Sequence, residues 1–339
     1  FGCLVGSEMC IRDRDKRDID TAMDSWITHE FDTQWEQQDW KLSLSKAGHI
    51  PGAGMLNIDT PSKNILFTGD FDSRDSPLTS GAKPIKTDVL FIEGTYGGKD
   101  HANQNEELTR FIDNIIRVTD KGGTVLIPAF ANGRTQDMLM RLHQNCPELD
   151  VHVDGMGKRI TKLYLENTQF IKDPKALNSA WNWCRRVASK SDRKKALDSD
   201  VIISTSGMLQ GGPAIWYLNR LRHDIENEIF FTGYQAKDTG GRKLQTESKI
   251  DIFGKQVDIN LNWEKFSFST HAGHKEITEF VYSCDPDDVV IYHTDANTAR
   301  PPLVDELEKN GINTHSPING TTYSICLLYT SDAADDNVG

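Results

Sequence analysis

The chain is 339 residues long, which exceeds one typical domain and predicts either two compact units or one domain inserted into another. Hydrophobic residues make up 37% and charged residues 26%, as in ordinary soluble globular proteins, and no stretch approaches the roughly 18 apolar residues that a membrane-spanning helix needs. We therefore expect a cytoplasmic protein with no membrane partner. The net charge of −12 disfavours indiscriminate binding to polyanions, although a local basic channel or a metal site would reverse the sign locally.

The two ends of the chain do not share the periodicity of the rest. FGCLVGSEMCIRDR (1–14) and CLLYTSDAADDNVG (326–339) resemble translated sequencing-adapter read-through of the kind found at the edges of assembled reads. Because two such matches occur at once, we expect non-native ends rather than two ordinary tails. The six cysteines include no CxxC pair, which argues against a thiolate zinc site and a disulfide framework.

Between these ends, short apolar runs alternate with amphipathic helical stretches. Helices are expected around Leu108–Ile116, over Arg134–Gln144, from Pro213 onward and between Pro302 and Gly311. The alternation predicts an α/β fold with largely parallel pairing. Six runs are short, rich in branched residues and bounded by turn formers, which predicts buried strands at 64–70, 88–96, 124–130, 201–207, 228–234 and 289–295.

Polar side chains follow the expected strands at their carboxyl ends, where open α/β sheets gather functional groups. Periodicity alone does not choose between a Rossmann-like fold and a layered αββα sandwich. A Rossmann enzyme needs GxGxxG after its first strand, and no expected strand is followed by that motif. The strand-end positions hold Asp70, Glu93, Ser206, Tyr234 and His293.

Four residues far apart in the chain carry groups suited to metal chemistry. His49 lies in the glycine-flanked AGHIPGAG, Asp70 ends a strand in FTGDF, His271 lies in FSFSTHAGH, and His293 ends VVIYHTD. Singly, each has an ordinary structural explanation, such as a loop histidine or an aspartate in a turn. Together, imidazole and carboxylate groups in glycine loops and at strand ends are the ligand types that zinc prefers.

At these motifs the chain resembles the β-CASP branch of the metallo-β-lactamase family, which includes the cleavage and polyadenylation endonuclease and RNase J. AGHIPGA and FTGDF resemble the third and fourth metal motifs of that family. IEGTYGG, FSFSTHAG and IYHTD resemble its three β-CASP motifs. The signatures IPAFANGRTQDML, STSGMLQGGPAIWYL and FTGYQAKDTGGRKL match as well, so the similarity covers roughly residues 15–325 in order.

The resemblance implies an α/β architecture of two parts. Residues 15–104 and 246–325 would form a metallo-β-lactamase αββα sandwich, incomplete at its N-terminal side. Residues 105–245 would form an inserted β-CASP α/β domain, with the active site in the cleft between the parts.

The resemblance also implies two zinc ions. His49 would bind one ion, Asp70 would bridge both, and His293 would complete the second site, where the pair neutralises the charge that develops on a phosphodiester. His271, oriented by Glu93, would protonate the leaving 3′-oxygen or stabilise the pentacovalent state, because an imidazole with a pKa near 6.5 exchanges a proton near neutrality.

Further residues are candidates for RNA and phosphate contacts. Ser206 and Gly207 suit a loop whose hydroxyl and backbone N–H groups approach phosphate. Arg134 and Arg242 would bind the RNA backbone, with a structural salt bridge as the alternative for each. Residues 185–195 hold six basic side chains and one acid, and are either a solvated helix face or a further RNA-contacting surface.

One family motif does not occur in the sequence. HxHxDH should precede His49, and the one histidine upstream, His29, has no companion. The chain offers three of the family's seven expected zinc ligands, so we expect an N-terminally truncated fragment with weak zinc occupancy and no activity of its own, derived from an active parent.

The expected function of the parent is that of a zinc-dependent RNA phosphodiester hydrolase in RNA processing or decay. The choice between endonuclease and exonuclease action stays open, as does assembly into a homodimer or an RNA-processing complex. One alternative is a non-catalytic scaffold subunit, in which ligand losses would be scattered across motifs rather than confined to one block. Another is a DNA-directed β-CASP nuclease, against which His293 argues, because the third β-CASP motif of those relatives usually lacks histidine.

Overall fold

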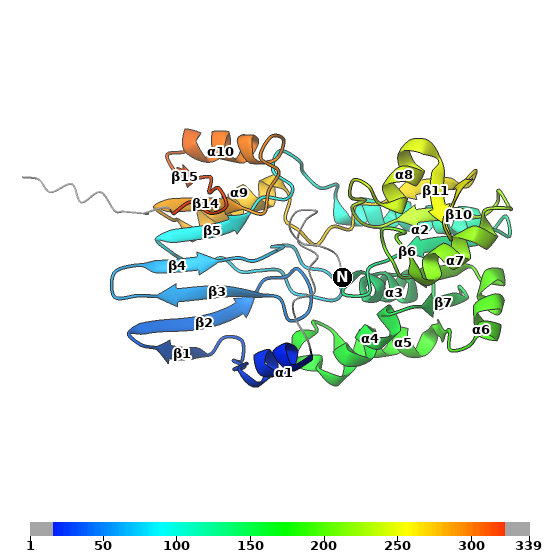
Figure 1. The fold of residues 1–339 in the computed structure, drawn as a ribbon, viewed down its shortest axis with the longest axis horizontal. Helices are drawn as coiled ribbons and strands as arrows, with labels where there is room; N and C mark the ends of the chain where they lie inside the picture. Colours follow the sequence, from blue (N-terminus) through cyan, green and yellow to red (C-terminus); the bar gives the residue numbers. More distant parts are fainter. Residues whose placement is uncertain (1–15, 323–339) are drawn as a thin grey trace, which may run out of the picture.

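The computed structural model describes residues 16–322, so the two expected non-native ends, 1–14 and 326–339, lie outside the described residues. Two sheets organise the described residues, and Figure 1 shows them side by side. A two-stranded hairpin of β11 (Lys249–Ile252) and β12 (Lys255–Asp258) packs beside the second sheet. Within residues 16–322, no helix is both long and apolar enough to cross a bilayer.

The first sheet has seven strands in the order β1-β2-β3-β4-β5-β14-β15. The strands from β1 to β4 pair antiparallel, whereas β4, β5, β14 and β15 pair parallel. The carboxyl ends of β4, β5 and β14 therefore meet at one edge. The strands are β1 (Gln34–Gln37), β2 (Trp40–Lys46), β3 (Gly54–Asp59), β4 (Asn64–Phe67), β5 (Val89–Glu93), β14 (Asp288–Tyr292) and β15 (Asn313–His315).

One face of this sheet carries a hydrophobic core. Leu66, Leu90 and Ile291 point to the same side, where they pack against α9 (His274–Cys284) and α10 (Arg300–Lys309). Side chains of alternate strand residues point to the opposite face, where Phe67 and Phe91 are half-buried and stack with ring centroids 4.2 Å apart. Among the described residues, the lactamase-like part therefore consists of one sheet with helices on one of its two faces.

The second sheet has six strands in the order β13-β10-β6-β9-β7-β8, and every neighbouring pair is parallel. Four of its strands are short and completely buried, which is expected of a parallel sheet covered on both faces. The strands are β6 (Val125–Pro128), β7 (Val151–Asp154), β8 (Arg185–Arg186), β9 (Val201–Ser204), β10 (Glu228–Phe231) and β13 (Asn262–Lys265).

Helices cover both faces of the second sheet, because side chains of successive strand residues point to opposite sides. Val125 and Ile127 belong to one core, and Leu126 between them belongs to the other. The first core is closed by α2 (Gln104–Thr119), α3 (Arg134–Asn145), α4 (Gly157–Glu166) and α5 (Pro174–Trp183), and the second by α7 (Gly212–Leu221) and α8 (Gly240–Glu247). The remaining helices are α1 (Lys16–Asp24) and α6 (Lys190–Lys195), with 3-10 turns at Thr168–Phe170 and Ala196–Asp198.

The structure confirms the six expected strands, which are β4, β5, β6, β9, β10 and β14, and the four expected helices, which are α2, α3, α7 and α10. The sequence predicts that the inserted domain ends at residue 245 and that the lactamase-like part returns at residue 246, whereas the strand pairing suggests a later return. Residues 262–265 form β13, which pairs with β10 of the second sheet, although the sequence assigned them to the lactamase-like part. Because the family motif nearest this point begins at Phe266, we propose a boundary after Lys265 in place of residue 246.

Candidate metal and catalytic site

The first sheet's edge brings the candidate residues together. Asp70 follows the end of β4, Glu93 is the last residue of β5, and His293 directly follows β14. His49 lies in the loop between β2 and β3, and His271 lies between β13 and α9. Residues that span 245 positions of sequence thus share one edge because parallel strands end there together.

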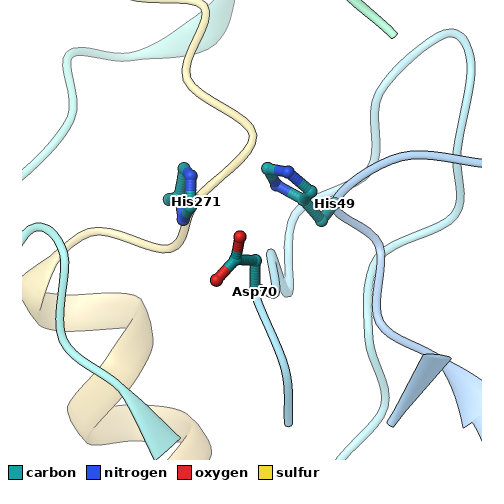
Figure 2. Close-up of side chains that lie close together, drawn as sticks. All are labelled: His49, Asp70 and His271. Carbon is teal, nitrogen blue, oxygen red and sulfur yellow. The ribbon is translucent and has the colours of Figure 1, made fainter. Parts of the chain in front are cut away.

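Three of these side chains form the centre of the cluster. The ligand atoms of His49, Asp70 and His271 all lie within 4.8 Å of one another. Figure 2 shows the carboxylate of Asp70 directed toward the space between the two imidazole rings, whose centroids are 4.6 Å apart. His293 joins from the other side, with its Nδ1 atom 2.7 Å from Oδ1 of Asp70.

The orientation of His49 is fixed by its loop. Its Nδ1 lies 2.9 Å from the backbone carbonyl oxygen of Thr270, which can only accept, so Nδ1 carries the proton and Nε2 is left with a free lone pair. Gly48 permits this loop, because a Cβ there would lie 2.1 Å from the carbonyl oxygen of Asp72 and the backbone has a φ of 77°. A histidine with one nitrogen held by a carbonyl is the usual arrangement of a metal ligand.

Glu93 and His271 form a hydrogen-bonded pair. The Nδ1 atom of His271 lies 2.7 Å from Oε1 of Glu93, whose side chain is fully buried. Oε1 also accepts from the backbone N–H of Phe71, and Oε2 accepts from that of Thr95. Glu93 lies within 4.8 Å of ligand atoms of Asp70 and His293 as well, but its oxygens are already engaged, which suits orientation of His271 better than metal binding.

The electrostatics of the pair follow from burial and charge. Burial lowers the pKa of His271, but the hydrogen bond and negative charge of Glu93, together with the charge of Asp70, outweigh it and hold that pKa above its ordinary value. Burial raises the pKa of Glu93, but the hydrogen bond and charge of His271 outweigh burial, so the pKa of Glu93 lies below its ordinary value. Burial and the nearby charge of His271 lower the pKa of His49, which favours the neutral imidazole that a metal requires.

His293 reaches Asp70 through an uncommon backbone conformation. Its φ is 46°, in the left-handed region that non-glycine residues rarely adopt. The turn comes immediately after β14 and its side chain is 55% exposed, so no core packing demands it. Strained backbone of this kind gathers at functional sites.

Two supporting residues were missed by sequence reasoning. Arg74 donates from Nη2 to the carbonyl oxygens of Ser269 and His271, both at 3.1 Å, while its guanidinium pairs with buried Asp72. His101 lies 2.9 Å from the same carbonyl oxygen of His271 through its Nε2. No local pattern marks these contacts, which join residues 170 to 197 positions apart.

The predicted phosphate contacts fall in different environments. Ser206 and Gly207 lie in the loop after β9, where the Ser206 hydroxyl accepts from the backbone N–H of Gln210 at 3.0 Å. Arg242 is exposed in the first turn of α8. Arg134 is 8% exposed and pairs with Asp137 at 3.3 Å, so in this conformation its guanidinium forms the salt bridge that was the predicted alternative to an RNA contact.

The donor set fits a metal. Imidazole nitrogen and carboxylate oxygen atoms come together from five segments, and His49 and His271 are oriented by a carbonyl and a carboxylate as metal-site histidines are. His49, Asp70 and His293 are the residues available to hold it.

Several known proteins resemble this chain over most of its length. A Beta-Casp domain model matches residues 135–244. The chain is 32% identical over 314 residues to an RNase of Saccharolobus solfataricus named aCSPSF2, covering 91% of this chain and 63% of the relative. It is also 32% identical over 286 residues to a probable RNase of Methanocaldococcus jannaschii named MJ4, covering 81% of this chain and 67% of the relative.

A eukaryotic relative is more distant. The chain is 29% identical over 306 residues to cleavage and polyadenylation specificity factor subunit 3 of Dictyostelium discoideum, covering 84% of this chain and 39% of the relative. The chain thus spans between about two fifths and two thirds of the length of these three curated relatives. Together with the matched β-CASP model and the metal-type cluster, this similarity shows that the chain belongs to the β-CASP metallo-β-lactamase ribonuclease family.

Proposed function

We propose that this chain carries part of the catalytic site of a zinc-dependent ribonuclease that hydrolyses phosphodiester bonds in RNA processing or decay. The proposal is supported by two adjoining groups of possible ligands that share Asp70, one with His49 and His271 and the other with Glu93 and His293. Relatives named as RNases support RNA as the substrate. A cytoplasmic location, and assembly as a homodimer or in an RNA-processing complex, belong to the same proposal.

His49, Asp70 and His293 would hold zinc, with Asp70 placed to reach both positions. Zinc bound there would polarise the attacking water and neutralise charge on the phosphate. The chain's own contribution to the bond-breaking step lies with His271. As water attacks phosphorus, the bond from phosphorus to the 3′-oxygen breaks, and Nε2 of His271 donates its proton to that oxygen.

Glu93 acts through His271. Because its carboxylate accepts from Nδ1 of His271, it fixes the ring and stabilises the protonated form that donates. Ser206, Gly207 and Arg242 would contact the RNA backbone from the second sheet. For Arg134 the same contact requires release from Asp137.

The test separates catalysis from metal binding in the full-length protein that contains this site. His271→Ala should lower the cleavage of a labelled RNA by about 10²-fold or more, while the bound zinc is unchanged. His223→Ala, which changes an exposed histidine outside the cluster, serves as the matched control. Cleavage at the wild-type rate would disprove the acid role, and loss of zinc would make His271 a ligand instead.

A further inference from the structure

The carboxyl-terminal edge of the second sheet faces the candidate metal site. The loop after β6 reaches the His49 loop, since a Cβ on Gly133 would lie 2.7 Å from Cγ2 of Ile50, the residue next to His49. The loops after β7, β9 and β10 open at the same edge, because all four strands are parallel. A substrate bound at the histidines therefore extends over these loops.

Large apolar side chains are exposed on this edge. Phe130 lies two residues after β6 and is 40% exposed, and Tyr234 lies three residues after β10 and is 60% exposed. Met156, two residues after β7, is 64% exposed. Within residues 16–322 neither Phe130 nor Tyr234 packs against another aromatic ring, whereas Phe111 and Phe266 in the core meet edge to face.

Glycines border the exposed ring of Phe130. A Cβ on Gly233 would lie 3.5 Å from the ring, and one on Gly207 would lie 3.3 Å from it. Because both positions lack a side chain, the ring stays uncovered between the loops after β9 and β10. Gly233 also precedes Tyr234, so the two aromatic residues belong to adjoining loops of neighbouring strands.

The same edge favours the binding of negatively charged groups, although the whole chain carries a net charge of −12. Helices α3, α4, α7 and α8 all begin there, with the positive ends of their dipoles. Lys237 and Asp238 follow Tyr234 in the loop after β10, Arg242 lies in the first turn of α8, and all three are exposed. Uncovered aromatic rings interleaved with such groups are the features of surfaces that bind single-stranded nucleic acid.

We propose that Phe130 and Tyr234 are base-stacking positions for single-stranded RNA that leads into the metal site. This inference rests on the proposed function and adds the side chains that contact the bases. Stacking on a protein ring requires an unpaired base, so the site selects single strands over duplex. Every base has a flat face, so these positions add affinity with little sequence preference.

The test measures binding without cleavage. A fluorescein-labelled 12-nucleotide RNA is titrated with the 339-residue chain in EDTA, and fluorescence anisotropy gives the dissociation constant. Phe130→Leu and Tyr234→Leu should each raise that constant about five- to a hundredfold, whereas Tyr234→Phe, which keeps the ring, should not. Phe253→Leu removes an exposed aromatic ring in the turn of the β11–β12 hairpin and should bind like wild type.

An abasic RNA supplies the second arm. Because an abasic strand offers no base to either ring, wild type should bind it about as weakly as the double variant Phe130→Leu, Tyr234→Leu binds the normal strand, and that double variant should be indifferent to the missing bases. Equal dissociation constants for wild type and both Leu variants, or equal binding of duplex and single strand by wild type, would overturn the inference. Failure of the proposed function is seen separately, as absence of RNA cleavage, and leaves this binding result unchanged.

Discussion

Two buried carboxylates hold the segment that presents His271. Glu93 accepts from His271 itself, and Glu107 in α2 accepts from the backbone N–H of Ser267, four residues earlier. Glu107 is 7% exposed and is neutralised by Arg110, which donates from Nε and Nη2 to its two oxygens at 3.0 Å. A buried carboxylate with complete hydrogen bonding stabilises the fold, whereas one that loses a partner destabilises it.

The effect of Glu107 on stability depends on pH. Burial raises the pKa of Glu107, but its hydrogen bond from Arg110 and the N–H of Ser267 outweigh it, so the folded pKa lies below the unfolded value of about 4.3. The stabilisation is therefore complete above that value and is lost as the pH falls through the folded pKa.

We expect Glu107→Gln to lower the free energy of unfolding by about 1–3 kcal/mol at pH 7, with a smaller difference from wild type in acid. Urea unfolding at a series of pH values measures this. Glu106→Gln, which changes an exposed neighbour in the same turn, should stay within about 0.5 kcal/mol of wild type. If the difference in free energy of unfolding between Glu107→Gln and wild type stayed constant with pH, the link between the protonation of Glu107 and stability would be refuted.

At the scale of elements, an aromatic cluster joins the second sheet to the segment that carries His271. Phe111 of α2 lies 5.0 Å from Phe266 and 5.2 Å from Phe268, measured between ring centroids, with both pairs edge to face. It also lies 6.1 Å from Phe230 of β10. Edge-to-face pairs gain energy beyond area burial, so this cluster fixes how the chain passes from β13 toward α9.

We expect Phe111→Ala to destabilise the protein by about 3–5 kcal/mol, because it leaves a cavity among rings that have little freedom to collapse. Ile116→Ala lies on the same helix but changes a side chain that is 38% exposed, and should cost about 1 kcal/mol or less. Thermal or urea unfolding distinguishes the two. Equal losses would mean that helix formation rather than ring packing dominates.

At the scale of the whole molecule, burial decided which elements could be predicted from sequence. The strands β6, β9 and β10 are completely buried and appear as continuous apolar runs. The antiparallel strands β1, β2 and β3 were missed because their residues are mostly exposed or half-buried and form no continuous apolar run; WKLSLSK of β2 alternates apolar and polar residues instead. Helix α6 has no buried residue and so has no apolar face to detect.

The candidate site likewise has residues that the sequence could predict and contacts that it could not. Its principal residues stand in compact motifs, so the motifs identified His49, Asp70 and His293 and the family order implied their meeting. The salt bridge of Arg134 with Asp137 is a local contact three residues apart on α3 and was one of the two predicted alternatives, whereas the support from Arg74 joins residues 197 positions apart and has no sequence signature. The strand pairing that moves the proposed boundary past Lys265 is likewise a long-range contact.

Zinc binding by the isolated chain tests the central claim most directly. Isothermal titration of the metal-free chain should detect zinc binding that Asp70→Asn weakens by about tenfold or more, because Asp70 lies between His49, His271 and His293. Asp75→Asn, which changes a carboxylate that is 58% exposed and paired with Lys172 instead, should bind zinc like wild type. Equal zinc affinity of wild type and Asp70→Asn would contradict the assignment of these side chains to one metal centre.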